Sequence, residues 1–324
     1  MVETSEKLDV ARSLRAALKF GHIHEQSDIA LAGACLRHLL GQVRITVTGP
    51  GCGDAIALSN LLAGRPLLPN AASGRLVEIK EGQATMATAH LGNGETKSYT
   101  NYSKEDGFEK SVRLMQITTD APMLVSAATT CATAKSTNRL RRLTGLVKDS
   151  TDIVLWLPCD LGDEELEIWC SLPDHIRAHG YLVLTPTCKD PTLLCKRARG
   201  HFADIIVVDP VSALEACHNI AGVDTALLQD SGGIDLLTFI EGEIRYLDQS
   251  VIDESEHLLM HAAVVASDES GQHSPETCAN RPMSRPTTLV GRMVDKQQPA
   301  PTNELGRFNS EGAKKNATPW SLGL

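Results

Sequence analysis

Hydrophobic residues near the beginning of the chain recur every three or four positions, which is the spacing of one face of an α-helix. The first set consists of Leu8, Ala11, Leu14 and Leu18. A second set between residues 29 and 40 continues the spacing after a break at residues 21–27. The pattern therefore predicts that residues 1–41 form a helical segment containing two helices.

Farther along, short apolar runs alternate with helical patterns, as in an α/β domain whose strands are joined by helices. The apolar runs lie at residues 45–47, 153–157 and 180–184, and helical patterns lie at 55–62 and 240–266. Beyond residue 267 this patterning ends, and residues 268–324 hold six of the fifteen prolines. We expect a disordered tail there.

The first predicted strand runs into a turn that opens a helix and contains Gly49, Gly51 and Gly53. A strand, a glycine loop and a helix in this order hold phosphate groups in many nucleotide-binding proteins. Their usual signature ends in Gly-Lys-Ser/Thr, whereas the matching positions here hold Asp54, Ala55 and Ile56. The three glycines alone could equally form a plain connection between strand and helix.

These replacements remove the chemistry that binds a nucleotide. Hydrogen bonds to charged groups contribute about 1.5–3 kcal/mol, so loss of the lysine weakens phosphate binding about tenfold to a hundredfold. The carboxylate of Asp54 repels a phosphate, at about 3 kcal/mol for each like-charge pair near 5 Å. We also expect Asp54 to accept hydrogen bonds from N–H groups at the helix start, as an N-cap residue does.

Six segments, in order between about residues 40 and 245, resemble the GTPase domain of the bacterial dynamin-like family. The first joins the glycine loop to Asn60 and to Gly64-Arg65-Pro66-Leu67-Leu68-Pro69, and the others lie at 76–82, 149–157, 180–185, 207–214 and 230–237. The resemblance implies a Ras-like α/β domain over residues 42–245, with a mostly parallel sheet flanked by helices. It also implies that a helix at 246–267 packs with the N-terminal helices. A helical hairpin that caps the sheet is the alternative.

The catalytic positions depart from the family. Its Asp-x-x-Gly motif is replaced near residues 124–129, and its switch-one threonine falls near residues 71–73 without a clear substitute. The vestigial base site would consist of Lys189, Asp190, Ser212 and Ala213, and the vestigial phosphate loop of Gly49, Gly51, Gly53 and Asp54. The resemblance therefore implies a degenerate member, a pseudo-GTPase, with no catalytic residue, no cofactor and no metal.

Composition narrows the partners and the compartment. The net charge of −9, without a basic stripe, argues against nucleic acid. Nine cysteines without a Cys-x-x-Cys pair indicate reduced thiols and a cytoplasmic protein. No apolar run approaches 18 residues, so no membrane span is expected, although peripheral membrane contact stays open.

Histidines supply the only metal-like spacing. His257 and His261 are one helical turn apart, with Glu254 one turn earlier. Without a third strong ligand we interpret them as a solvated helix face, and His22 and His24 as chance neighbours.

Two functional hypotheses follow. In the first, a frozen GTPase-like surface binds a protein partner, such as an intact dynamin-like GTPase or a membrane-peripheral assembly, as a scaffold or regulator. A homodimer is also open. In the second, the chain is a divergent GTPase that binds GTP weakly and hydrolyses it slowly. Nucleotide dependence distinguishes the two.

Overall fold

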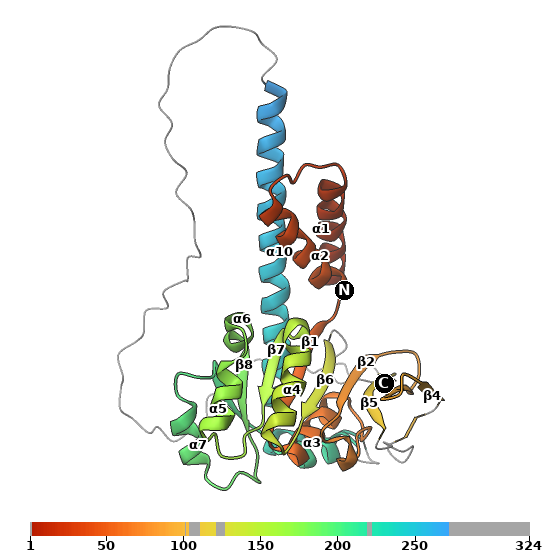
Figure 1. Cartoon of the computed structure of the whole chain (residues 1–324), viewed down its shortest axis with the longest axis vertical. Helices are drawn as coiled ribbons and strands as arrows, with labels where there is room; N and C mark the ends of the chain where they lie inside the picture. Colours follow the sequence, from red (N-terminus) through yellow and green to blue (C-terminus); the bar gives the residue numbers. More distant parts are fainter. Residues whose placement is uncertain (1, 101, 104–110, 121–126, 219–221, 272–324) are drawn as a thin grey trace. The chain divides into compact units, whose positions relative to one another are not determined.

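The computed structural model describes residues 2–100, 102–103, 111–120, 127–218 and 222–271 (Figure 1). In this part, nine strands form one sheet in the order β4-β3-β5-β2-β6-β1-β7-β8-β9. The strands are β1 (Val43–Gly49), β2 (Leu76–Glu81), β3 (Met86–Leu91), β4 (Thr96–Thr100), β5 (Val112–Thr119), β6 (Ala127–Thr133), β7 (Ile153–Trp156), β8 (Gly180–Leu184) and β9 (Asp204–Val207). The three predicted apolar strands correspond to β1, β7 and β8.

The sheet is mixed, so the expectation of a mostly parallel sheet was wrong. From β6 to β9 every neighbouring pair is parallel. On the other side, β2 is antiparallel to β6 but parallel to β5, and β3 is antiparallel to both β4 and β5. The antiparallel pair β3–β4 follows from a tight turn at Asn93-Gly94, where Gly94 has φ of 89° and the Leu91 N–H donates to the Glu95 carbonyl. Such Asn-Gly turns join antiparallel strands.

Several helices pack against the sheet, which confirms the α/β class. The described part of the chain contains ten α-helices in all. They are α1 (Val2–Lys19), α2 (Gln26–Leu40), α3 (Cys52–Leu62), α4 (Thr137–Val147), α5 (Asp163–Cys170), α6 (Asp174–Ala178), α7 (Pro191–Ala198), α8 (Pro210–Cys217), α9 (Thr225–Asp230) and α10 (Gly233–Gly271), with 3-10 turns η1 (Asn70–Ala72) and η2 (Lys148–Ser150). One core joins β1 and β7 to α3, α8 and the base of α10, and another joins β7 and β8 to α4, α5 and α7. None of the described helices has the length and apolar content that crossing a bilayer requires.

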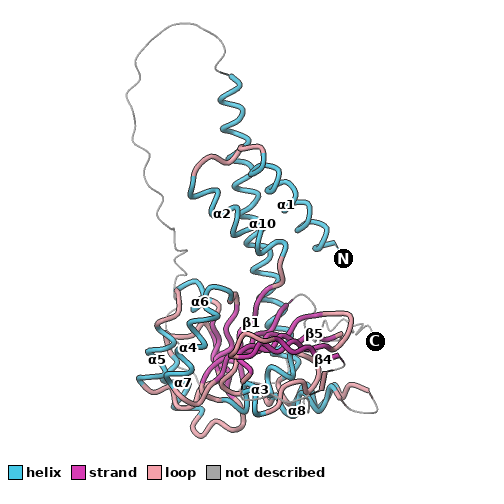
Figure 2. The backbone as a smooth tube through the Cα atoms, turned by 45° about the vertical axis from the view of Figure 1, so that its right-hand side comes forward, coloured by secondary structure: helices cyan, strands magenta, loops and turns pink. Residues whose placement is uncertain are grey.

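Helices α1, α2 and α10 pack side by side (Figure 2). Their shared core contains Leu14, Ala32, Cys35, Leu258 and Ala262. The two helices expected within residues 1–41 are therefore present as α1 and α2. The domain boundaries after residues 41 and 245 stay predictions. Residues 268–271 continue α10, and the rest of the expected tail, 272–324, lies outside the described residues.

A charged network fastens this helical segment. The carboxylate of Asp248 on α10 lies 2.7 Å from the Lys7 ammonium of α1 and 3.2 Å from His38 Nε2 of α2. The other ring nitrogen of His38 lies 3.9 Å from Asp152, just before β7. Burial alone would raise the pKa of Asp248, but the hydrogen bonds from His38 and Lys7 outweigh it and lower the pKa.

We expect Asp248→Asn to reduce the free energy of unfolding by about 1–2 kcal/mol at pH 7, since it removes two charge-assisted hydrogen bonds at partly buried positions. Because the pKa of Asp248 is lowered on folding, its stabilisation is present above the ordinary value of 3.8 and is lost as the pH falls below it. Urea denaturation between pH 3 and pH 7 checks both effects. If the free energy of unfolding of the variant fell with decreasing pH as steeply as that of the wild type, this role for Asp248 would be contradicted.

Candidate functional site

The glycine turn predicted to bind phosphate closes tightly against β7. Gly49 ends β1 with φ of 122°, and a Cβ at this position would overlap the carbonyl oxygen of Leu157. The Gly51 N–H donates to that same oxygen over 3.1 Å. Gly49 thus has the positive φ and close backbone approach that only glycine accepts readily.

The helix after the turn begins earlier than expected. α3 starts at Cys52 rather than near Ala55, so Gly53 and Asp54 lie within its first turn. The Cys52 N–H donates to Pro50 and the Ala55 N–H to Gly51. Together with the Gly51 N–H, three amides of this segment are already used by the chain. The side chain of Ala55 is fully buried, so the position that holds lysine in a phosphate loop faces the core.

Asp54 makes a different contact from the expected one. The N-cap of α3 is Gly51, and it makes no side-chain cap hydrogen bond, so the N-cap role expected for Asp54 was wrong. The Asp54 carboxylate accepts hydrogen bonds from the hydroxyls of Thr185, at 2.6 Å, and Thr187. Both threonines follow β8, so Asp54 joins the glycine turn directly to the loop expected to read a base.

Three of the four residues of the expected base site take part in helix starts or packing, and the fourth is exposed. Asp190 caps α7 by accepting a hydrogen bond from the Leu193 N–H at 2.9 Å, and Lys189 is exposed. In α8, the Ser212 hydroxyl donates to the Asp209 carboxylate at 2.6 Å, and Ala213 is fully buried. The local reason is helix capping, which short Asp side chains perform well.

The expected position of the Asp-x-x-Gly motif was wrong. Residues 127–129 begin β6 rather than end it, and 124–126 lie outside the described residues. The carboxyl end of β6 is Thr133, whose hydroxyl donates to the Gly49 carbonyl at 2.6 Å. Near the expected switch-one threonine, residues 70–72 form the turn η1, and the Gly74 N–H after it donates to the Thr133 carbonyl at 2.6 Å.

A buried carboxylate after β7 was missed by sequence reasoning. Glu165 is 7% exposed and accepts hydrogen bonds from the Trp156 indole at 2.7 Å, the Leu161 N–H at 3.0 Å and the Cys159 N–H at 3.3 Å. Burial raises the pKa of Glu165, although these hydrogen bonds oppose the shift. The loop therefore surrounds an anion that the protein itself supplies. The available signal was an acidic residue on the side of α5 that also carries Ile168 and Trp169.

A crevice of about 370 Å³ lies at the carboxyl ends of the parallel strands. This edge is where ligands bind in open α/β sheets. Pro50 of the glycine turn and Lys135 after β6 line it, together with four carboxylates: Asp160, Asp163, Glu164 and Glu165. Four acids against one lysine give the crevice an electrostatic character that disfavours a phosphate.

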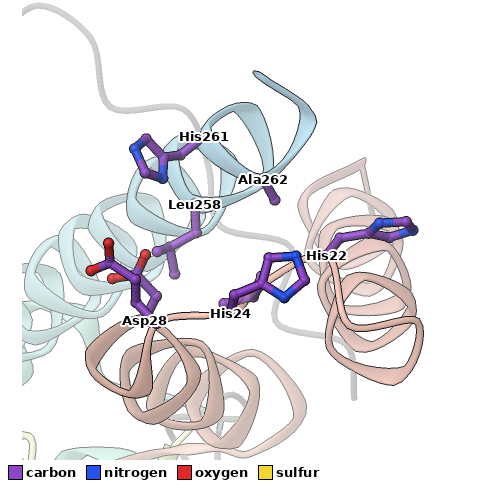
Figure 3. Close-up of a pocket in the computed structure, with 8 residues that line it drawn as sticks. His22, His24, Asp28, Leu258, His261 and Ala262 are labelled. Carbon is purple, nitrogen blue, oxygen red and sulfur yellow. The ribbon is translucent and has the colours of Figure 1, made fainter. Parts of the chain in front are cut away.

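Histidines line a separate cavity of about 260 Å³ in the helical segment (Figure 3). His24 projects between the helices, and His261 on α10 lies on the same side as Asp28 of α2, whereas His22 points away. His257 does not line this cavity. Within the described residues, no three His, Cys, Asp or Glu side chains are arranged to hold a metal ion.

Neither a protein-family model nor a curated protein matches the sequence. Solved structures do match the fold. Two structures of an oligomerised bacterial dynamin pair, described as a mechanism for long-range sensing and tethering of membranes, are 11% identical, with TM-scores of 0.58 and 0.56. The match covers 84% of this chain and 57% or 56% of theirs. The LeoA bacterial dynamin GTPase from ETEC is 10% identical over 83% of this chain and 47% of that one, with a TM-score of 0.32, too low to support an argument.

The fold is therefore similar to that of the two bacterial dynamin structures. At 11% identity the likeness concerns the fold alone, and this chain spans less than two thirds of the length of those neighbours.

Proposed function

We propose that this chain is a pseudo-GTPase that works through protein contacts, as a scaffold or regulator, rather than by turning over a nucleotide. The observation that carries the proposal is the Asp54 carboxylate in the first turn of α3, hydrogen-bonded to Thr185 and Thr187. A carboxylate there places negative charge where a triphosphate would sit. The engaged amides of Gly51, Cys52 and Ala55 and the acidic crevice support the same conclusion.

The same contact suggests how the surface is kept in one form. GTPase switches change shape because loops are held by the terminal phosphate and released on its loss. Here a carboxylate that never leaves holds the loop after β8, and the segment near the expected first switch is held by the hydrogen bond from the Gly74 N–H to the Thr133 carbonyl. We propose that the resulting constant surface binds a protein partner in the cytoplasm or at a membrane periphery, with an intact dynamin-like GTPase as the first candidate. The membrane activity described for the structural neighbours would then belong to that partner.

Calorimetric titration with GTP, GDP and ATP in the presence of magnesium tests the proposal. We expect no binding heat up to millimolar nucleotide for the wild type, because loop amides and carboxylates exclude the phosphates. We expect the same for Asp54→Ala, since the amides stay engaged. An intact dynamin-like GTPase in the same assay is the positive control. Micromolar binding of a guanine nucleotide to the wild type would overturn the proposal and favour the divergent GTPase.

A further inference from the structure

Two neighbouring residues of α5 both contact His201, which lies in the loop between α7 and β9. The sulfur of Cys170 is 3.8 Å from His201 Nδ1. The indole N–H of Trp169 donates a hydrogen bond to the backbone carbonyl of His201 at 2.8 Å. The Trp169 ring, which is fully buried, also stacks on the ring of Phe202, with the two centroids 4.2 Å apart. A buried tryptophan therefore holds the backbone of His201, and the imidazole lies beside a thiol.

A tight turn presents the imidazole to this thiol. Residues 198–201 form the turn, and the His201 N–H donates to the Ala198 carbonyl at 3.0 Å. Arg199 has φ of −56° and ψ of 125°, and Gly200 has φ of 77°. These angles are those of a type II turn, in which glycine is favoured at the third position. The place of the imidazole thus follows from the local backbone as well as from Trp169.

The surroundings of Cys170 leave its activation to the imidazole. Cys170 is exposed and is the last residue of α5, where the helix end disfavours negative charge. Glu167 lies one turn earlier, but it pairs with Arg141 at 2.9 Å. In the tautomer that carries its hydrogen on Nε2, the His201 ring accepts the thiol hydrogen at Nδ1. A nucleophile within hydrogen-bond reach of a base, with the base held in place by a third group, is the arrangement of an activated thiol.

Cys159 is the other exposed cysteine in the part of the chain that the structure describes, and its surroundings are of the opposite kind. Burial and the carboxylates of Asp160 and Glu165 raise the pKa of Cys159, although Lys189 opposes the shift. Because the thiolate is the nucleophile, a raised pKa keeps this cysteine less reactive near neutral pH. Both thiols are exposed, so the neighbouring imidazole is the feature that distinguishes Cys170.

We propose that Cys170 is a modification site that forms a mixed disulfide with a low-molecular-weight thiol, and that His201 is its general base. The reagent is a low-molecular-weight disulfide, R–S–S–R. His201 Nδ1 takes the thiol proton while the Cys170 sulfur attacks one sulfur of the reagent. The S–S bond of the reagent breaks, and a bond between Cys170 and one R–S group forms. The departing thiolate then receives the proton from the imidazole. Cys170 is oxidised, and the released thiol is the reduced product.

A small disulfide fits this pair better than a metal ion does. A thiol and an imidazole are both metal ligands, but a stable site needs further ligands. Among the described residues, no third His, Cys, Asp or Glu joins the pair to complete a metal site. The modification is also separate from the proposed loss of nucleotide binding, since neither Cys170 nor His201 lines the crevice beside the glycine turn.

Peptide mass mapping of the full chain during treatment with oxidised glutathione tests the proposal. We expect Cys170 to gain the glutathione adduct about tenfold faster than Cys159 at pH 7. We expect His201→Ala to slow the reaction at Cys170 by about tenfold or more and to leave Cys159 unaffected. Trp169 contacts the backbone carbonyl of His201, so this substitution retains that hydrogen bond. His218→Ala removes an exposed histidine after α8 and is the matched control, with both rates expected to stay unchanged.

A second reagent tests the class of ligand. Iodoacetamide alkylates a thiol without disulfide exchange, and we expect it also to prefer Cys170 over Cys159 and to depend on His201. Dithiothreitol should remove the glutathione adduct and restore the free thiol. Equal rates at the two cysteines, or a Cys170 rate that is unchanged in His201→Ala, would overturn the proposal. Alkylation of Cys170 without any glutathione adduct would overturn the disulfide as its reagent.

Discussion

Replacing Gly49 by alanine is expected to lower the free energy of unfolding by about 3–5 kcal/mol, through backbone strain and overpacking together. The residue has φ of 122°, and its new Cβ would overlap the Leu157 carbonyl oxygen, which also accepts the Gly51 N–H. Neither the strand nor the loop after β7 can move without breaking parallel sheet pairing. Urea denaturation followed by circular dichroism measures the change.

Gly53→Ala is the matched control, four residues farther along the same turn. Gly53 lies inside α3, and a Cβ there would meet no atom within 4 Å. Because alanine favours helix more than glycine does, we expect this variant to be about 0.5–1 kcal/mol more stable than the wild type. Equal effects of the two substitutions would show that the turn does not have the described conformation.

The second large effect is expected at Glu165. Its replacement by alanine leaves two buried donors, the Trp156 indole and the Leu161 N–H, without their acceptor, and removes a partly buried hydrogen bond from the Cys159 N–H. Each unsatisfied buried donor costs about 1–3 kcal/mol, and relief of the buried charge offsets part of this, so we expect a net loss of about 3–4 kcal/mol. The measurement is the free energy of unfolding at pH 7.

Glu164→Ala is the control for this prediction, since Glu164 is exposed and accepts one hydrogen bond, from Thr137. We expect it to cost less than about 1 kcal/mol.

The pH dependence of the free energy of unfolding gives a second readout for Glu165. The pKa of Glu165 is raised above 4.5 in the folded protein. Its protonation therefore contributes fully to the free energy of unfolding below pH 4.5, and this contribution declines as the pH rises through the folded-state pKa. Glu165→Gln should flatten this decline, and an unchanged profile would exclude Glu165 as its source.

Local pattern was enough to predict three strands of the parallel part of the sheet and the first helix. The apolar runs around Val47, Leu155 and Val183 are buried strands, and helical spacing around Leu14 predicted α1. The strands β3, β4 and β5 were not predicted, although β3 alternates buried and more exposed residues along its whole length and β5 along most of its own. A further signal for the hairpin of β3 and β4 was the Asn93-Gly94 turn.

The candidate site was predicted in outline only. The order of strand, glycine turn and helix around Gly49 and Asp54 was predicted because these features are consecutive, although α3 begins at Cys52 and already contains Asp54. The partners of Asp54 lie 131 and 133 residues away, at Thr185 and Thr187. No local rule predicts such a contact. Glu165 was hidden for another reason, since propensity treats an acid in the first helical turn as a favourable surface residue.

Helix α10 has a mechanical consequence. Its first turns supply Leu236, Ile240 and Ile244 to the core under the sheet, and its later turns supply Leu258 and Ala262 to the core of the helical segment. At 1.5 Å per residue, its 39 residues form a rod of about 58 Å. A tilt of about 5° at the sheet end would displace the far end of such a rod by about 5 Å. One continuous helix therefore joins the two cores, so a small tilt at the sheet end would be enlarged at its tip.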